Sequence, residues 1–120
     1  MTNSDMRQPT FFDDAQSGHP VDAGRVTLYA LGEFQARGKV LAERELPLDR
    51  LRGALRRAAE KFGVDELADE EAVAALGAHG AEVRRVPTFV AKHPFRVIVP
   101  TALAERARNF YQETNAPTAT

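Results

Sequence analysis

The sequence predicts an α+β domain in which a four-stranded antiparallel sheet packs against three helices, in the order ββα-α-ββα. Residues 25–62 and residues 82–111 each contain the same succession of strand, tight turn, strand, proline and helix. A further helical segment separates these two halves. Two β-hairpins connected by helices favour one antiparallel sheet with its helices mainly on one face.

The first half opens with a predicted hairpin. Residues 25–34 carry apolar side chains on both faces, which is typical of a central strand that is covered on two sides. Gly32 interrupts this strand and marks a bulge. A tight turn with Gly38 at positive φ follows, and residues 39–46 form the second, more exposed strand.

Two helices follow this hairpin. The first covers residues 48–62 and ends at Gly63, because its apolar residues recur at intervals of three and four: Leu48, Leu51, Leu55, Ala58 and Phe62. The second runs from Asp65 or Asp69 to Ala78. Acidic residues crowd its first turn, where the helix dipole favours them, and Gly80 supplies a left-handed cap.

The second half repeats the strand pair. Residues 82–91 and 95–99 are the predicted strands, with the turn at 92–94. Pro87 cannot donate a ladder hydrogen bond, which predicts an edge or a break at that point. Thr101 is the candidate N-cap of the last helix, whose apolar stripe is Leu103, Ala107 and Phe110.

One short segment resembles a known family. Val86-Pro87-Thr88-Phe89-Val90 resembles the segment around the cis-proline of thioredoxin-like proteins. The resemblance implies a redox-inactive binding version of that fold, since the redox cysteine pair of the family is missing. A hairpin also replaces the early β-α-β unit, and we do not assign the chain to this family.

Composition limits both compartment and chemistry. The chain has 120 residues and no cysteine, which excludes disulfides, thiolate metal sites and cysteine nucleophiles. We expect one domain at 25–112, between a disordered or partner-docked arm at 1–24 and a disordered tail at 113–120. The start lacks a signal-peptide pattern and no apolar run is long enough for a membrane span, so we expect a cytoplasmic protein. Its small size favours homodimerisation.

The charges are arranged in blocks along the chain, although the net charge is −1. Residues 1–24 carry four Asp and one Arg, and residues 65–83 carry six acids and no base. Residues 25–64 and 84–112 are basic. Such blocks favour the orientation of a partner or of a second copy, and they also fit a mixed, solvated surface.

No catalytic set, cofactor site or metal site is predicted. Ser4 and Ser17 both lie in the arm, so the domain has no serine nucleophile. His79 and His93 with Glu82 or Asp65 form a weak metal set, and either histidine is a weak acid–base candidate. The glycines near His79 end a helix, whereas phosphate loops precede one. Glu43 and Glu45 on one strand face are better explained as charges that protect an exposed edge.

Two hypotheses for function remain. The first is a non-enzymatic protein-interaction or regulatory module, expected to be homodimeric, in which Phe11 and Phe12 of the arm dock on the domain, on a second subunit or on another protein. Gln8–Phe12 also resembles the pentapeptide that binds bacterial sliding clamps. The alternative is a nucleic-acid-associated protein, with DNA as a candidate ligand, that contacts phosphates through the arginine-rich face of helix 48–62 and two neighbours: Arg50, Arg52, Arg56, Arg57, Lys61, Arg84 and Arg85. That face alternatively pairs with the acids at 65–71.

Overall fold

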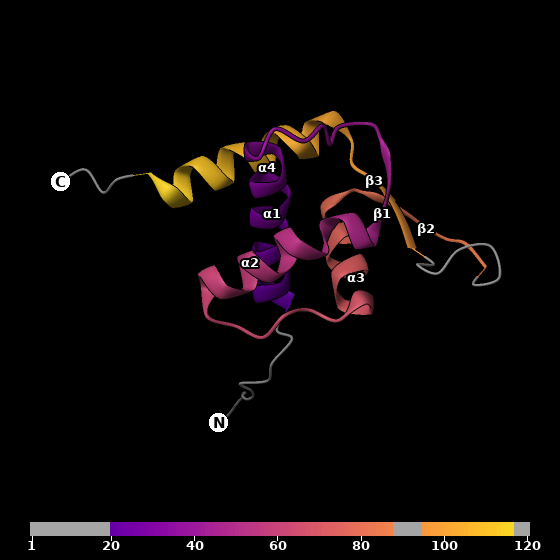
Figure 1. Cartoon of the computed structure of the whole chain (residues 1–120), viewed down its shortest axis with the longest axis horizontal. Coiled ribbons are helices and arrows are strands. Elements are labelled where there is room, and N and C mark those ends of the chain that lie inside the picture. Colours follow the sequence, from indigo (N-terminus) through magenta and orange to yellow (C-terminus); the bar gives the residue numbers. More distant parts are fainter. Residues whose placement is uncertain (1–19, 88–94, 117–120) are drawn as a thin grey trace, which may run out of the picture.

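The computed structural model describes residues 20–87 and 95–116, which form an α+β fold (Figure 1). Within these residues there are four α-helices, one short 3-10 helix and a three-stranded antiparallel sheet. The predicted arrangement of four strands and three helices is therefore wrong. In chain order the elements are α1 (Pro20–Ala36), β1 (Glu45–Pro47), η1 (Leu48–Leu51), α2 (Arg52–Phe62), α3 (Asp69–His79), β2 (Glu82–Arg85), β3 (Phe95–Ile98) and α4 (Thr101–Asn115).

The main correction concerns residues 25–34, which lie in helix α1 and not in a strand. This helix runs through the centre of the molecule and packs against α2, α3 and α4 (Figure 1). A helix that is covered on most sides is apolar on most sides, and over ten residues this pattern is the same as that of a two-sided strand. The hydroxyl of Thr27 donates to the carbonyls of Ala23 (2.9 Å) and Gly24 (3.0 Å), which satisfies this polar group inside the helix.

The sheet has the strand order β1-β3-β2, and both pairs are antiparallel. Leu46 of β1 and Val83 of β2 both lie opposite Val97 of β3. The predicted pairing of residues 25–34 with 39–46 does not occur, and β1 pairs instead with the second half of the chain. The predicted hairpin of 82–91 with 95–99 is confirmed for β2 and β3, whereas its turn at 92–94 lies outside the described residues.

The two middle helices follow their sequence signals. The helix predicted over 48–62 is confirmed, with η1 as its first turn and Gly63 as its left-handed C-cap (φ 68°). Helix α3 begins at Asp69, the later of the two predicted starts, and ends at Gly80 (φ 110°). The backbone N–H of Ala68 donates to the carboxylate of Glu71 at 2.9 Å, which closes the start of α3.

Gly32 marks a close helix crossing, not the predicted bulge. It lies in α1 where α4 passes over it, and a Cβ atom built at this position would overlap Tyr111 and the carbonyl oxygen of Ala107. Gln35 Nε2, one turn further along α1, donates to the carbonyl of Ala104 in α4 at 2.9 Å. A glycine is therefore required for the two backbones to approach each other here.

The start of α4 also differs from the prediction, because its N-cap is Pro100 and not Thr101. The carboxylate of Glu43 accepts hydrogen bonds from the backbone N–H (2.7 Å) and the hydroxyl (3.1 Å) of Thr101. Glu43 reaches this position with a left-handed backbone (φ 63°), while its own N–H donates to Val99. A carboxylate at a helix N-terminus is favoured by the helix dipole, so Glu43 has a structural role.

Three further predictions can be compared with the structure: the bounds of the arm and tail, the thioredoxin resemblance, and the absence of a membrane span. Residues 20–24, assigned to the arm, lie in α1, and residues 113–115, assigned to the tail, lie in α4. The described residues contain no cis peptide bond, so Val86–Pro87 lacks the feature on which the thioredoxin resemblance depends. None of the helices in the described part of the chain combines the length and apolar character that crossing a bilayer requires.

Candidate functional site

Most of the arginines proposed as phosphate contacts are paired with carboxylates of the same chain. Arg52 of α2 is bound to Asp69, to Glu66 (3.2 Å) and to the carbonyl of Leu67 (2.7 Å). Arg56 approaches Glu66 at 4.0 Å. The acids at 65–71 thus neutralise this part of the α2 face, as the alternative interpretation of that face expects.

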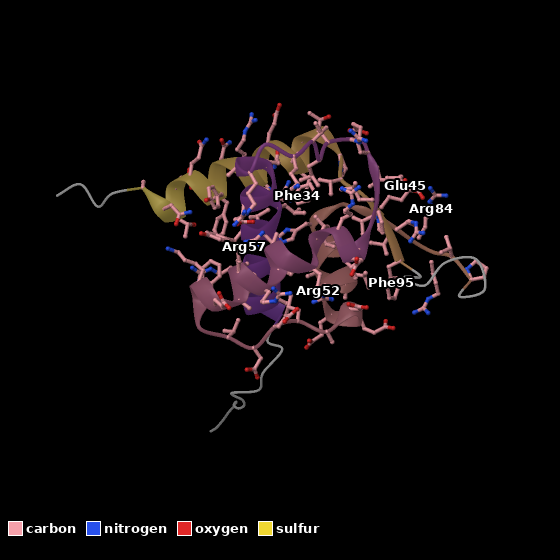
Figure 2. The ribbon with its side chains drawn as sticks, in the orientation of Figure 1. Phe34, Glu45, Arg52, Arg57, Arg84 and Phe95 are labelled. Carbon is pink, nitrogen blue, oxygen red and sulfur yellow. The ribbon has the colours of Figure 1, made fainter. Side chains whose placement is uncertain are left out.

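Arg57 of α2, labelled in Figure 2, belongs to a partly buried ion-pair network with Glu33 of α1. Its Nε and Nη2 atoms donate to the two carboxylate oxygens of Glu33 at 2.6 and 3.0 Å, and Arg37 donates to the same carboxylate at 2.8 Å. Burial alone would raise the pKa of Glu33, but the hydrogen bonds and charges of Arg57 and Arg37 hold that pKa below its usual value. The hydrogen bond to Glu33 in turn raises the pKa of Arg57. This arginine fixes α2 on α1.

The two arginines of β2 are paired in the same way. Arg84 is bound to Glu45 of β1, across the intervening strand β3, as Figure 2 shows, and it lies 3.7 Å from Glu82. Arg85 contacts Glu70 of α3 at 3.1 Å, and its guanidinium lies 4.5 Å from the ring centroid of Phe95. Of the seven candidate cations, Arg50 and Lys61 have no ion-pair partner within residues 20–87 and 95–116.

The remaining candidates from the sequence do not form a catalytic or metal site there. Phe11, Phe12 and His93 lie outside the described residues. His79 Nε2 forms a hydrogen bond with the carbonyl oxygen of Gly24 at 2.8 Å, which joins the end of α3 to α1. The described residues contain no cluster of three histidine, cysteine or acidic side chains that could hold a metal ion.

A pocket of about 300 Å³ lies where the C-terminal end of α1 meets the loop that leads to β1. Phe34 of α1, labelled in Figure 2, and Leu46 of β1 are its buried apolar residues (4% and 8% exposed). Val40 of the loop also lines it and is 61% exposed, an unusual position for a large apolar side chain. The other lining residues are Gly38, Lys39, Arg44 and Arg50.

The three cations of this pocket, Lys39, Arg44 and Arg50, are exposed and have no ion-pair partner in the part of the chain that the structure describes. The neighbouring acids are used elsewhere, because Glu43 caps α4 and Glu45 binds Arg84. Lys39 follows the C-terminus of α1, where the helix dipole favours a cation. That position accounts for Lys39 alone and leaves two arginines without a structural role.

We call the pocket formed by its seven lining residues the basic pocket: Phe34, Gly38, Lys39, Val40, Arg44, Leu46 and Arg50. Its chemistry suits a ligand that combines negative charge with an apolar side chain. Two guanidiniums and one ammonium can each donate to carboxylate oxygens, and the apolar residues can cover an aromatic or aliphatic group. No family model matches the chain, and comparisons with curated proteins and with solved structures found no match.

Sequence reasoning identified Arg50 but missed the rest of the basic pocket. It placed Phe34 and Arg44 in paired strands, so that they could not converge on one hollow. Tertiary contact between the end of α1 and a segment about ten residues later creates the pocket, and no local periodicity reports such a contact. One local signal was available: Lys39 and Val40 follow the correctly predicted turn at Gly38 (φ 85°).

Proposed function

We propose that this chain is a small cytoplasmic, non-enzymatic interaction module that binds an acidic segment of a protein at the basic pocket. The observation that carries the proposal is the combination, in one hollow, of three cations without carboxylate partners and an exposed Val40 above buried Phe34 and Leu46. The two arginines of the pocket differ in this respect from six others of the described residues, which contact carboxylates of the same chain: Arg37, Arg52, Arg56, Arg57, Arg84 and Arg85.

The nucleic-acid alternative has weaker support. Five of its seven cations bind carboxylates of the same chain, and each would have to give up that partner to contact phosphate. Arg50 and Lys61 remain, at the start and end of the 48–62 helical segment, roughly 16 Å apart along it at 1.5 Å per residue. Two separated cations neutralise few phosphates, which predicts weak binding to a duplex.

Fluorescence anisotropy with a labelled synthetic peptide, Ser-Leu-Asp-Glu-Leu-Asp-Glu-Ser, tests the proposal on the full chain. We expect saturable binding that weakens by about tenfold or more when Arg44→Glu and Arg50→Glu are combined, since both attraction and desolvated contacts are lost. Binding should also weaken with added salt, because these cations are exposed. Val40→Ser should weaken binding without a change in salt dependence.

The matched control combines Lys61→Glu with Arg108→Glu, which changes the net charge equally at exposed positions outside the pocket. It should leave the peptide affinity within about twofold of the unmodified chain, because surface charges beyond a Debye length of roughly 10 Å are screened at 0.1 M salt. Equal losses in both double variants, or equal affinity for the Asn/Gln version of the peptide, would reject a specific pocket. Tighter binding of a DNA duplex than of the peptide would favour the alternative.

A further inference from the structure

We infer that the basic pocket of one copy is occupied by Phe11-Phe12-Asp13-Asp14 of a second copy, so that two chains associate by exchange of their N-terminal segments. This inference rests on the proposed function and names the segment that binds. It adds a symmetric assembly in which each copy supplies one segment and one pocket. Three features of the molecule support this exchange: the chemical complementarity of segment and pocket, the reach of the segment, and the unpartnered groups at the pocket.

The N-terminal segment and the basic pocket are chemically complementary. Within residues 1–24 the acids outnumber the bases by four to one, and Asp13 and Asp14 follow directly on the aromatic pair. The basic pocket offers the opposite pattern, with buried Phe34 and Leu46 beside Lys39, Arg44 and Arg50. An aromatic ring over an apolar floor, followed by a carboxylate beside a guanidinium, is a common way for a peptide to be held.

Reach decides between the same copy and a second copy. Helix α1 begins at Pro20 at one side of the molecule and ends at the other (Figure 1). Phe34, near its C-terminal end, lines the pocket. The fourteen residues from Pro20 to Phe34 span about 21 Å of helix. The six residues from Asp14 to Pro20 span at most about 20–22 Å when fully extended. To reach its own pocket, the segment would have to run straight along α1, which is already covered by α2, α3 and α4. A segment from a second copy has no such limit.

A partner also explains the pocket itself. Among the described residues, Val40 is the large apolar side chain that is exposed to solvent. The cations next to it have no carboxylate partner in that part of the chain. A second copy supplies both an apolar cover for Val40 and carboxylates for Arg44 and Arg50. Because two such contacts form at once in a symmetric pair, each gains from the effective concentration that the other provides.

Sedimentation equilibrium of the full chain tests the inference. We expect a reversible dimer that dissociates as salt is raised. Two variants should both be monomeric: one in the arm (Phe11→Ser with Phe12→Ser) and one in the pocket (Arg44→Glu with Arg50→Glu). A mixture of these two variants should form a heterodimer, since one intact segment then meets one intact pocket. Arg44 and Arg50 are exposed, and circular dichroism of each variant is the check that it is folded.

The outcomes separate this inference from the proposed function. If the unmodified chain is monomeric throughout, or if its dimer survives the arm substitutions, segment exchange is wrong. A monomeric chain whose affinity for the synthetic acidic peptide rises at least fivefold on the arm substitutions would show docking within one copy, which also overturns the inference. In each of these cases peptide binding at the pocket still stands or falls by the anisotropy experiment.

Discussion

At the scale of single residues, Glu33 shows how this chain uses its charges. The residue is 8% exposed, yet Arg57 and Arg37 hold the pKa of its carboxyl group below the usual range in spite of burial, which favours the ionised form. An ionised group inside a protein is tolerated only with such partners. The same residue ties α2 to the C-terminal half of α1, close to the turn that leads into the basic pocket.

The lowered pKa of Glu33 predicts that the stability of the fold depends on pH. Its folded-state pKa lies below its unfolded value, so the ionised carboxylate stabilises the fold at pH values above the unfolded pKa. This contribution is lost as the pH falls through the folded-state pKa. We expect Glu33→Gln to lower the free energy of unfolding by about 1–2 kcal/mol at pH 7. The effect is no larger because Arg57 is partly exposed, and water screens its interaction with the carboxylate.

Urea denaturation at pH 7 and at successively lower pH measures this effect. The difference between Glu33→Gln and the unmodified chain should shrink as the pH falls from the unfolded-state pKa through the lower folded-state pKa, because the unfolded chain takes up the proton more readily than the folded one. Asp65→Asn, at an exposed acid for which the structure gives no ion pair, serves as control and should show little difference at any pH. A constant difference for Glu33→Gln across the whole range would contradict the assignment.

At the scale of elements, the close crossing of α1 and α4 predicts that alanine in place of Gly32 destabilises the fold, although helix propensity alone favours alanine. Alanine normally stabilises a helix by roughly 1 kcal/mol relative to glycine. In Gly32→Ala the new methyl group would overlap the backbone of Ala107, which can move only if α4 moves. We expect Gly32→Ala to destabilise the fold by about 1–3 kcal/mol, in the range of overpacked cores.

Gly77 of α3 provides the matched control, since a Cβ atom there would meet nothing within 4 Å. Gly77→Ala should stabilise the protein by up to about 1 kcal/mol through helix propensity. Thermal unfolding of both variants compares the two signs directly. If the melting temperatures of both variants rise, the α1–α4 crossing is looser than the structure requires.

The same elements explain which parts of the fold the sequence predicts. Helices α2 and α3 carry local signals, namely an apolar stripe or an acidic first turn together with the caps Gly63 and Gly80, and both were predicted. Helix α1 was predicted as a strand because its contacts cover most of its sides and erase the helical period. This one error also misplaced β1, since its true neighbour β3 lies about fifty residues away in sequence.

At the scale of the whole molecule, the basic pocket depends on how segments far apart in sequence meet. The candidate site combines the end of α1, a loop, β1 and η1, of which the sequence predicted only Arg50 as a binding residue. The sequence shows the charge blocks. It does not show which charges within them pair with each other. Arg52 and Arg57, which share one helix, bind carboxylates of different elements. Only the folded arrangement distinguishes paired cations from the three of the basic pocket.

The most direct test of this account is a map of backbone amide chemical shifts of the ¹⁵N-labelled full chain, titrated with the synthetic acidic peptide. We predict that the largest shift changes fall within residues 34–50 and disappear when Arg44→Glu and Arg50→Glu are combined. Shift changes that centre instead on the α2 face around Arg52 and Lys61, or that scatter over the surface, would contradict the assignment of the basic pocket as the binding site.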